Sequence, residues 1–202
     1  MHGADKLVSR SVLGFIAPVV LLLAAWWGTL FAGASDPAIA TMAFAGLIAG
    51  IALDATVLRR RLDSLFSMGD RALFAVAIFY SVGIYGFFMG FPVFNAAVGI
   101  LGGYIAARRA AAMGWSRERA MRDARRFAVS TTLILAALCG ATAYLALNEA
   151  TLGSQLRGMF WLPLDVSRPM IYGIIGVGGA GLLAFQYGAA ILTARWSAHV
   201  PA

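Results

Sequence analysis

The stretch that decides the fold is RRAAAMGWSRERAMRDARR, residues 108–126, a basic segment between two apolar runs. Three further basic stretches lie at the N-terminus, at residues 59–71 and at Arg195, and a pair of apolar runs separates each from the next. Lys and Arg concentrate on the cytoplasmic side of membrane proteins. Because a pair of spans returns the chain to the same side, this spacing predicts six transmembrane helices with both ends in the cytoplasm.

The composition agrees with a membrane protein. Of the 202 residues, 61% are hydrophobic and 12% are charged, and so much apolar surface does not fit inside one small soluble core. The net charge is +7, but a nucleic-acid-binding protein carries its basic residues on a water-exposed domain, and we find none. We therefore expect anionic lipid headgroups, not nucleic acid, as partners of residues 108–126. The excess of Arg over Lys and the abundance of Ala indicate a bacterial protein of the cytoplasmic (inner) membrane.

The predicted fold is an all-α, polytopic integral membrane protein that forms one helical domain over residues 1–202. The spans are predicted at residues 12–31, 37–58, 72–89, 92–107, 127–147 and 169–194. Gly90-Phe91-Pro92 leaves so short a connection that the third and fourth helices should form a tight antiparallel hairpin. The fifth span should continue without a break from a cytoplasmic helix that Ser116 can cap.

The first apolar run could be read as a signal peptide, because basic residues precede it and small residues follow it. The run is long for that purpose, and Trp26-Trp27 near its outer end suits the aromatic belt of a membrane interface. We therefore expect a retained anchor helix.

Small residues at four-residue spacing mark the faces through which membrane helices pack. Such rows occur in three of the predicted spans: Gly46 and Gly50; Gly99 and Gly103; and Gly176, Ala180, Ala184 and Gly188. The first row continues inward to Asp54, and the second continues outward to Asn95. Both polar residues should therefore face other helices and not lipid.

Asp54, Asn95 and Gln186 are the candidate substrate- or ion-binding residues. A carboxylate inside a membrane is costly, so Asp54 indicates either a cation, proton or substrate site or an ion pair with Arg108 or Arg109 near the inner surface. The shallow depth of Asp54 favours the ion pair. Asn95 either lines a cavity or cross-links the helical hairpin, and residues such as Gln186 usually join helices by hydrogen bonds.

The sequence argues against several chemistries. The only histidines are His2 and His199, and the only lysine is Lys6, all outside the spans. Haem ligation, a His-based metal site and a retinal Schiff base are thus excluded within the membrane, and we predict no metal and no cofactor. These arguments do not exclude a lipid or pigment that is held by backbone and aromatic contacts, because such contacts leave no sequence motif. No hydrolase or nucleotide-binding motif is present, so we predict no catalytic residues and disfavour an enzyme.

Two arginines break the basic pattern. Arg157 and Arg168 lie in the predicted outer loop, near the apolar segment around Trp161, where they could contact an anion or a lipid. Three hypotheses follow: a transport or permeation module for an ion or small solute, an accessory or assembly subunit of another membrane protein, and a lipid-modifying enzyme. The first leads because polar residues coincide with packing faces. A homo-oligomer or a subunit of a membrane complex is expected.

Overall fold

The computed structural model describes residues 3–58, 65–87, 92–149, 151–161, 163 and 166–198, and the regular elements within these ranges are all helices. The chain divides into two compact units, of which unit 1 ends at Gly69 and unit 2 begins at Asp70. Each unit is considered by itself. The predicted all-α class is confirmed for the described residues, whereas the single domain over 1–202 stays a prediction.

Five helical stretches are long and apolar enough to cross a membrane: Asp5–Phe31, Asp36–Val57, Asp70–Phe87, Arg117–Asn148 and Arg168–Ser197. They match five of the six predicted spans in order. The remaining span, predicted at 92–107, falls on the short turn η3 (Pro92–Asn95) and on α6 (Ala96–Ala112), which carries Arg108 and Arg109 near its end. Of the predicted tight connection Gly90-Phe91-Pro92, the first two residues lie outside the described residues.

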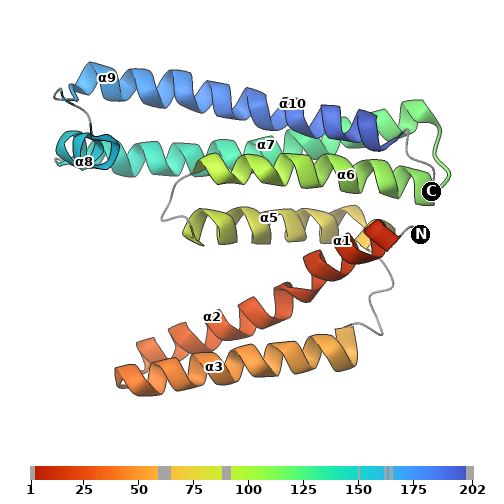
Figure 1. Cartoon of the computed structure of the whole chain (residues 1–202), viewed down its shortest axis with the longest axis horizontal. Helices are drawn as coiled ribbons and strands as arrows, with labels where there is room; N and C mark the ends of the chain where they lie inside the picture. Colours follow the sequence, from red (N-terminus) through yellow and green to blue (C-terminus); the bar gives the residue numbers. More distant parts are fainter. Residues whose placement is uncertain are drawn as a thin grey trace. The chain divides into compact units, whose positions relative to one another are not determined.

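Unit 1 contains α1 (Gly3–Gly14), α2 (Ile16–Phe31), α3 (Asp36–Leu53), the π-helical turn η1 (Asp54–Leu58) and the 3-10 turn η2 (Leu65–Ser67). The first predicted span is therefore interrupted at Phe15, between α1 and α2. Pro18 causes the interruption, because it has no N–H to donate to the carbonyl of Gly14. Figure 1 shows the resulting change of direction between the two helices.

The hairpin of α2 and α3 is packed backbone to backbone. A side-chain carbon on Gly46 would overlap the Leu21 carbonyl, and one on Gly50 would lie 2.7 Å from the Ala17 carbonyl oxygen. Gly33, with φ of +70°, makes the turn between the helices, and Pro37 lies in the first turn of α3. Both glycines of the predicted row thus lie at a helix contact.

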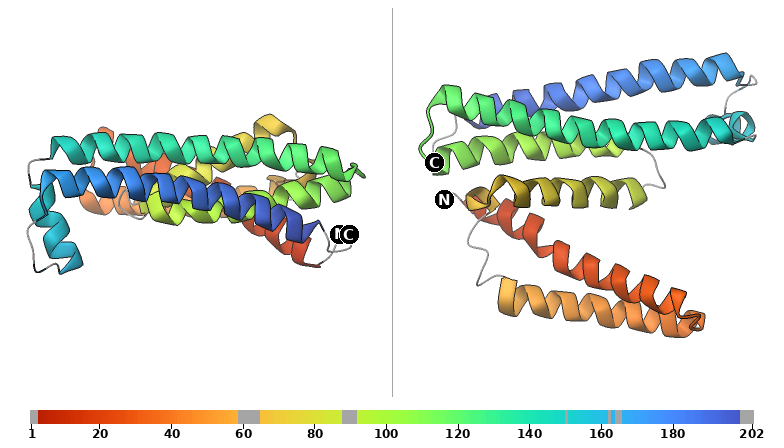
Figure 2. Two further views of the ribbon diagram at one scale, coloured as in Figure 1. Left: turned by 90° about the horizontal axis from the view of Figure 1, so that it is seen from above. Right: turned by 180° about the vertical axis from the view of Figure 1, so that it is seen from behind.

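Unit 2 contains α5 (Asp70–Phe87), η3, α6, α7 (Arg117–Asn148), α8 (Leu152–Phe160), α9 (Arg168–Gly173), the π-helical turn η4 (Ile174–Gly178) and α10 (Gly179–Ser197). Figure 2 shows α6, α7 and α10 running side by side, with α8 lying across the end of α7. The Arg119 backbone N–H donates to Ser116 Oγ over 3.4 Å. The predicted cap and the unbroken helix after it are confirmed.

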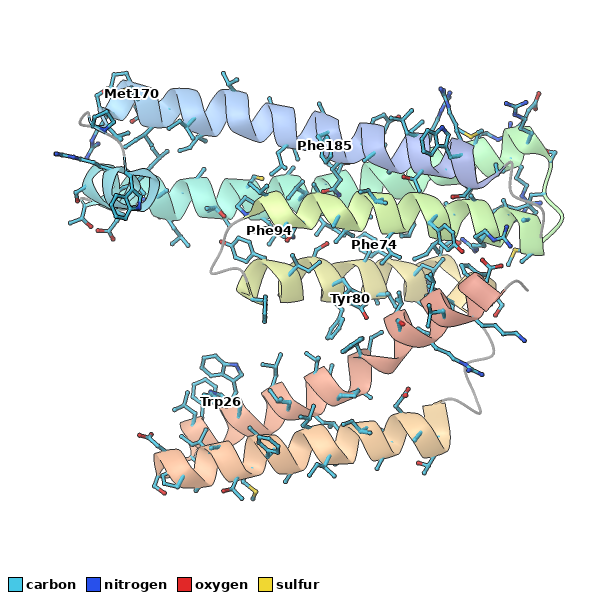
Figure 3. All side chains as sticks on the ribbon, viewed as in Figure 1. Trp26, Phe74, Tyr80, Phe94, Met170 and Phe185 are labelled. Atoms are coloured by element: carbon cyan, nitrogen blue, oxygen red, sulfur yellow. The ribbon has the colours of Figure 1, made fainter. Side chains whose placement is uncertain are left out.

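The outer surfaces of both units carry large apolar side chains. Phe31, Phe87, Val177 and Trp196 are among those most exposed. Figure 3 shows Trp26 on the side of α2 turned away from α3. Exposed apolar surface on this scale suits a lipid environment, since lipid tails take the place of a protein core.

Candidate functional site

We refer to the two buried amide residues of unit 2, Asn95 and Gln186, as the polar layer. Asn95 ends η3 just before α6, Gln186 lies in α10, and each residue is only 1% exposed. Gly99, one turn after Asn95, lets the two helices approach: a side-chain carbon there would lie 2.7 Å from Gln186 Cγ. Gly99 and Gly103 therefore face α10, and the sequence predicts that their row faces another helix without identifying which one.

One hydrogen bond sets the orientation of the Asn95 amide. Its Nδ2 donates to the Ser81 carbonyl of α5 over 2.8 Å. If the amide were rotated by 180°, Oδ1 would face the Ser81 carbonyl oxygen and the two would repel each other. The atom left without this hydrogen bond is therefore Oδ1.

Two amide oxygens in this layer are buried without a hydrogen-bond partner among the described residues: Asn95 Oδ1 and Gln186 Oε1. A buried acceptor left in this state costs about 1–3 kcal/mol, and most such groups in proteins meet a partner, an ion or a water. Unit 2 therefore contains two buried acceptor oxygens whose hydrogen-bonding capacity is unused by the described residues.

A third oxygen, Thr132 Oγ1 of α7, is also buried and without a partner in the described part of the chain. Gly102 of α6 meets the ring of Phe127, which fixes the register of the antiparallel α6 and α7. At 1.5 Å per residue, Gly99 is then level with about residue 130 of α7. Thr132 thus lies within about one turn of the level of Gln186.

A buried arginine joins three helices at the basic end of unit 2. Arg109 Nη2 lies 2.6 Å from Asp70 Oδ1, and Nη1 lies 3.6 Å from Asp123 Oδ2. The guanidinium also stands 5.3 Å from the ring centre of Trp115. Arg109, one of the two arginines suggested as a partner of Asp54, is thus paired with acidic residues of α5 and α7.

Two cavities follow the contact of α5 with α6 and α7. The larger, of about 310 Å³, has charged walls that include Asp70, Arg109 and Asp123. The smaller, of about 10 Å³, is lined by apolar side chains and Tyr80. Leu73 and Phe127 belong to both walls, so the cavities adjoin at these two side chains. A charged vestibule therefore meets an apolar constriction there.

Asp54 lies in unit 1, at the start of the π-helical turn η1. It is buried, and its Oδ2 would be 3.3 Å from a side-chain carbon on Gly14, beside the break between α1 and α2. Asn95 and Gln186 both belong to unit 2, where each is buried, and Asp54 belongs to unit 1.

The predicted outer-loop contact residues are placed at the start of α9, within α8 and at the end of α8. Arg168 begins α9 and lines a cavity of about 130 Å³, whose wall contains neither Arg157 nor Trp161. Trp161 is 91% exposed, with φ of +53°, and ends α8. Nearby, the Thr151 hydroxyl and backbone N–H bond Glu149 Oε1 and lower the pKa of that carboxyl. The contact with an anion or a lipid therefore stays a prediction.

The predicted row of α10 faces outward within unit 2. Gly176, Ala180 and Ala184 are exposed, and nothing in the described structure approaches within 4 Å of a side-chain carbon built on Gly176 or Gly188. The face that contacts α6 carries Gln186, Ala190 and Ala194 instead.

Sequence reasoning missed Ser81 and the pairing of Arg109 with two acids, and it named Thr132 only as one of several residues able to form hydrogen bonds between helices. Serine and threonine in spans are too common to mark a site, and the acids of an ion pair cannot be told from surface charges by sequence alone. Comparison with protein-family models, with curated proteins and with solved structures finds no match for this chain.

Proposed function

We propose that this chain is a transport or permeation module that binds a monovalent cation between α6 and α10 and passes it across the bacterial cytoplasmic membrane. In this proposal the chain crosses the membrane six times, with both ends in the cytoplasm and α6 as the short fourth span. The observation that carries the proposal is the pair of buried amide oxygens, Asn95 Oδ1 and Gln186 Oε1, without hydrogen-bond partners.

The ligand chemistry follows from the oxygens. Both are neutral amide acceptors, and neither residue has a carboxylate among its described contacts. Calcium prefers several oxygen ligands that include carboxylates, whereas neutral carbonyl oxygens can replace part of the hydration shell of K⁺. The pair would supply two ligands and water the others, which favours Na⁺ or K⁺.

The route would begin at the charged vestibule. Asp70 and Asp123 attract a cation to this cavity, while Arg109 between them limits the depth of the attraction. The apolar constriction at Leu73 and Phe127 follows, and hydrophobic constrictions can gate by dewetting. The polar layer of Ser81 and Asn95 lies further along α5 and α6.

The test is cation flux through the full chain in proteoliposomes, measured with K⁺- and Na⁺-sensitive dyes under a gradient of each ion. We expect flux of at least one ion above that of protein-free vesicles. Gln186→Met should abolish it, and Gln155→Met, the same change in α8, should leave it intact. Wild-type protein that passes neither ion, or a Gln186→Met variant with unchanged flux, would contradict the proposal.

A second candidate is an assembly role, in which the outward row of α10 packs against another membrane protein or a second copy of this chain. The exposure of Gly176, Ala180 and Ala184 favours it, because small residues on a free face permit close helix contact. Ala184→Leu should then lower the oligomer mass measured by native mass spectrometry. An unchanged mass, or a monomeric wild type in lipid with no captured membrane partner, would speak against this role.

A further inference from the structure

A further cleft of unit 2, separate from the three cavities described above, lies between the end of α6, the start of α7 and the end of α10. Its volume is about 540 Å³, within the range of ligand-binding pockets. It does not share Arg109, Asp70 or Asp123 with the vestibule described above. The argument for its ligand is therefore independent of cation transport.

The floor of the cleft is made of methyl groups. Ala107, Ala110, Ala124 and Ala194 are buried and line it. Such a surface offers no hydrogen bond and fits the hydrocarbon part of a ligand.

The rim of the cleft is positive. Arg117 and Arg125 of α7 and Arg195 of α10 line it, and none of the lining residues that the structure describes is acidic. The nearby Asp123 lines the other cavity, where it pairs with Arg109. Arginine side chains bind phosphate oxygens through paired N–H groups, so the rim suits a phosphate.

The aromatic residue of the cleft argues against a nucleotide. Trp115 has the guanidinium of Arg119 4.5 Å from its ring centre and that of Arg109 at 5.3 Å. Its ring is thus already engaged by cations and is poorly placed to stack on a base. A ligand with one phosphate and a hydrocarbon part fits the remaining chemistry.

From the apolar floor and the arginine rim, we propose that this cleft is a specific site for the headgroup of an anionic phospholipid. The phosphate lies among Arg117, Arg125 and Arg195, and the glycerol and first acyl carbons lie on the alanine floor. The exposed Trp196, at the neighbouring end of α10, is of the kind found at a membrane interface. The site differs from general attraction between a basic helix and the membrane, because it needs the cleft as well as the charge.

Binding can be measured by native mass spectrometry of the full chain in a neutral detergent, titrated with phosphatidylglycerol. Phosphatidylcholine tests the need for net negative charge, and glycerol 3-phosphate tests whether a soluble anion suffices. Replacing Arg125 by Gln should weaken phosphatidylglycerol binding about fivefold, and replacing all three rim arginines should reduce it to the level of phosphatidylcholine. Arg122→Gln removes the same charge one turn earlier on α7, outside the cleft wall, and should weaken binding less than about twofold.

A variant that keeps the charge tests the cleft itself. Ala111 is exposed and lines the cleft, so Ala111→Trp should fill it without disturbing the buried floor. We expect this variant to lose phosphatidylglycerol binding while it keeps the wild-type melting temperature. Equal losses in Arg122→Gln and Arg125→Gln, full binding by Ala111→Trp, or equal binding of glycerol 3-phosphate would each overturn the proposal.

Discussion

Two helix contacts, one in each unit, both depend on a pair of glycines four residues apart, but the polar residues beside them differ. In unit 1, Gly46 and Gly50 pack α3 on α2, and Asp54 follows one turn later. In unit 2, Gly99 and Gly103 pack α6 on α10, and Asn95 precedes them by one turn. Asp54 is not left without a partner, whereas the amide oxygens of Asn95 and Gln186 have none among the described residues. Glycine spacing marks these two helix contacts, although the row from Gly176 to Gly188 faces outward. The buried amide oxygens without described partners distinguish the candidate site in unit 2 from plain packing.

The largest expected loss of stability follows from filling the space at the glycines, because in both contacts a glycine lies against the backbone of the neighbouring helix. Gly50→Ala and Gly103→Ala should each lower the free energy of unfolding by about 2–3 kcal/mol, because the new methyl group meets backbone that cannot move aside. Thermal unfolding in detergent measures this. Gly188→Ala on α10 is the control, since nothing lies within 4 Å, and it should be neutral or stabilise by up to about 1 kcal/mol. Tolerance of Gly103→Ala would remove the close contact that positions Gln186.

A somewhat smaller loss is expected at Arg109. Arg109→Gln should destabilise by about 2 kcal/mol, because it leaves Asp123, whose side chain is 19% exposed, without its buried cation. Asp70 is 80% exposed on its side chain, so Asp70→Asn should cost less than about 1 kcal/mol despite the shorter distance. Urea unfolding of the full chain in detergent, followed by the circular dichroism of the helices, compares the two. Equal losses of stability in Arg109→Gln and Asp70→Asn would show that the burial of Asp123 does not decide the cost of removing its partner.

The polar layer itself should respond differently at its two residues. Gln186→Met replaces an amide whose oxygen has no partner by an apolar side chain of similar size, so stability should stay equal or rise by about 1 kcal/mol. Asn95→Leu should lower it by about 1–2 kcal/mol, since the Ser81 carbonyl loses its donor. Melting temperatures without added Na⁺ or K⁺ measure both. A Gln186→Met variant as unstable as Gly103→Ala would make Gln186 a structural residue.

The smallest expected effect is on the pKa of Glu149, whose Oε1, unlike the amide oxygens of the polar layer, accepts hydrogen bonds. The Thr151 hydroxyl donates to Glu149 Oε1 over 2.6 Å and holds the pKa of Glu149 below its usual range. A lowered pKa stabilises the folded state at pH values above the unfolded pKa, and this contribution disappears as pH falls through the folded pKa. Thr151→Val should raise the pKa of Glu149, measured by carbon NMR with labelled glutamate. No change would mean that the backbone N–H of Thr151 accounts for the whole shift.

Much of the fold follows from sequence periodicity and local signals. The apolar runs of α3, α5 and α7 and the cap at Ser116 are local properties, and the structure has them where the sequence predicts. The break at Phe15 was not predicted, although Pro18 is its visible cause. The helix α8 was read as loop, because its nine residues are too short for a clear pattern.

The candidate site was predictable only in part. Asn95 and Gln186 were named from their polarity within apolar runs, and their proximity depends on which face of α10 meets α6. Helix α10 has two rows of small residues, one containing Ala180 and Ala184 and the other containing Ala190 and Ala194. Residue sizes alone do not tell these rows apart. The choice depends on the shape of the partner helix, which sequence spacing does not supply.

The most direct test of the central claim is to observe the Gln186 side chain while cations are added. The chain has only two glutamines, Gln155 and Gln186, so protein labelled with carbon-13 at the glutamine side-chain carbonyl gives two NMR signals. Gln186→Met assigns them, and Gln155 in α8 is the internal reference. We predict that titration with K⁺ or Na⁺ shifts the Gln186 signal to saturation and leaves the Gln155 signal in place. A Gln186 signal that stays fixed under both ions, or that moves only together with Gln155, would contradict a cation site in the bundle.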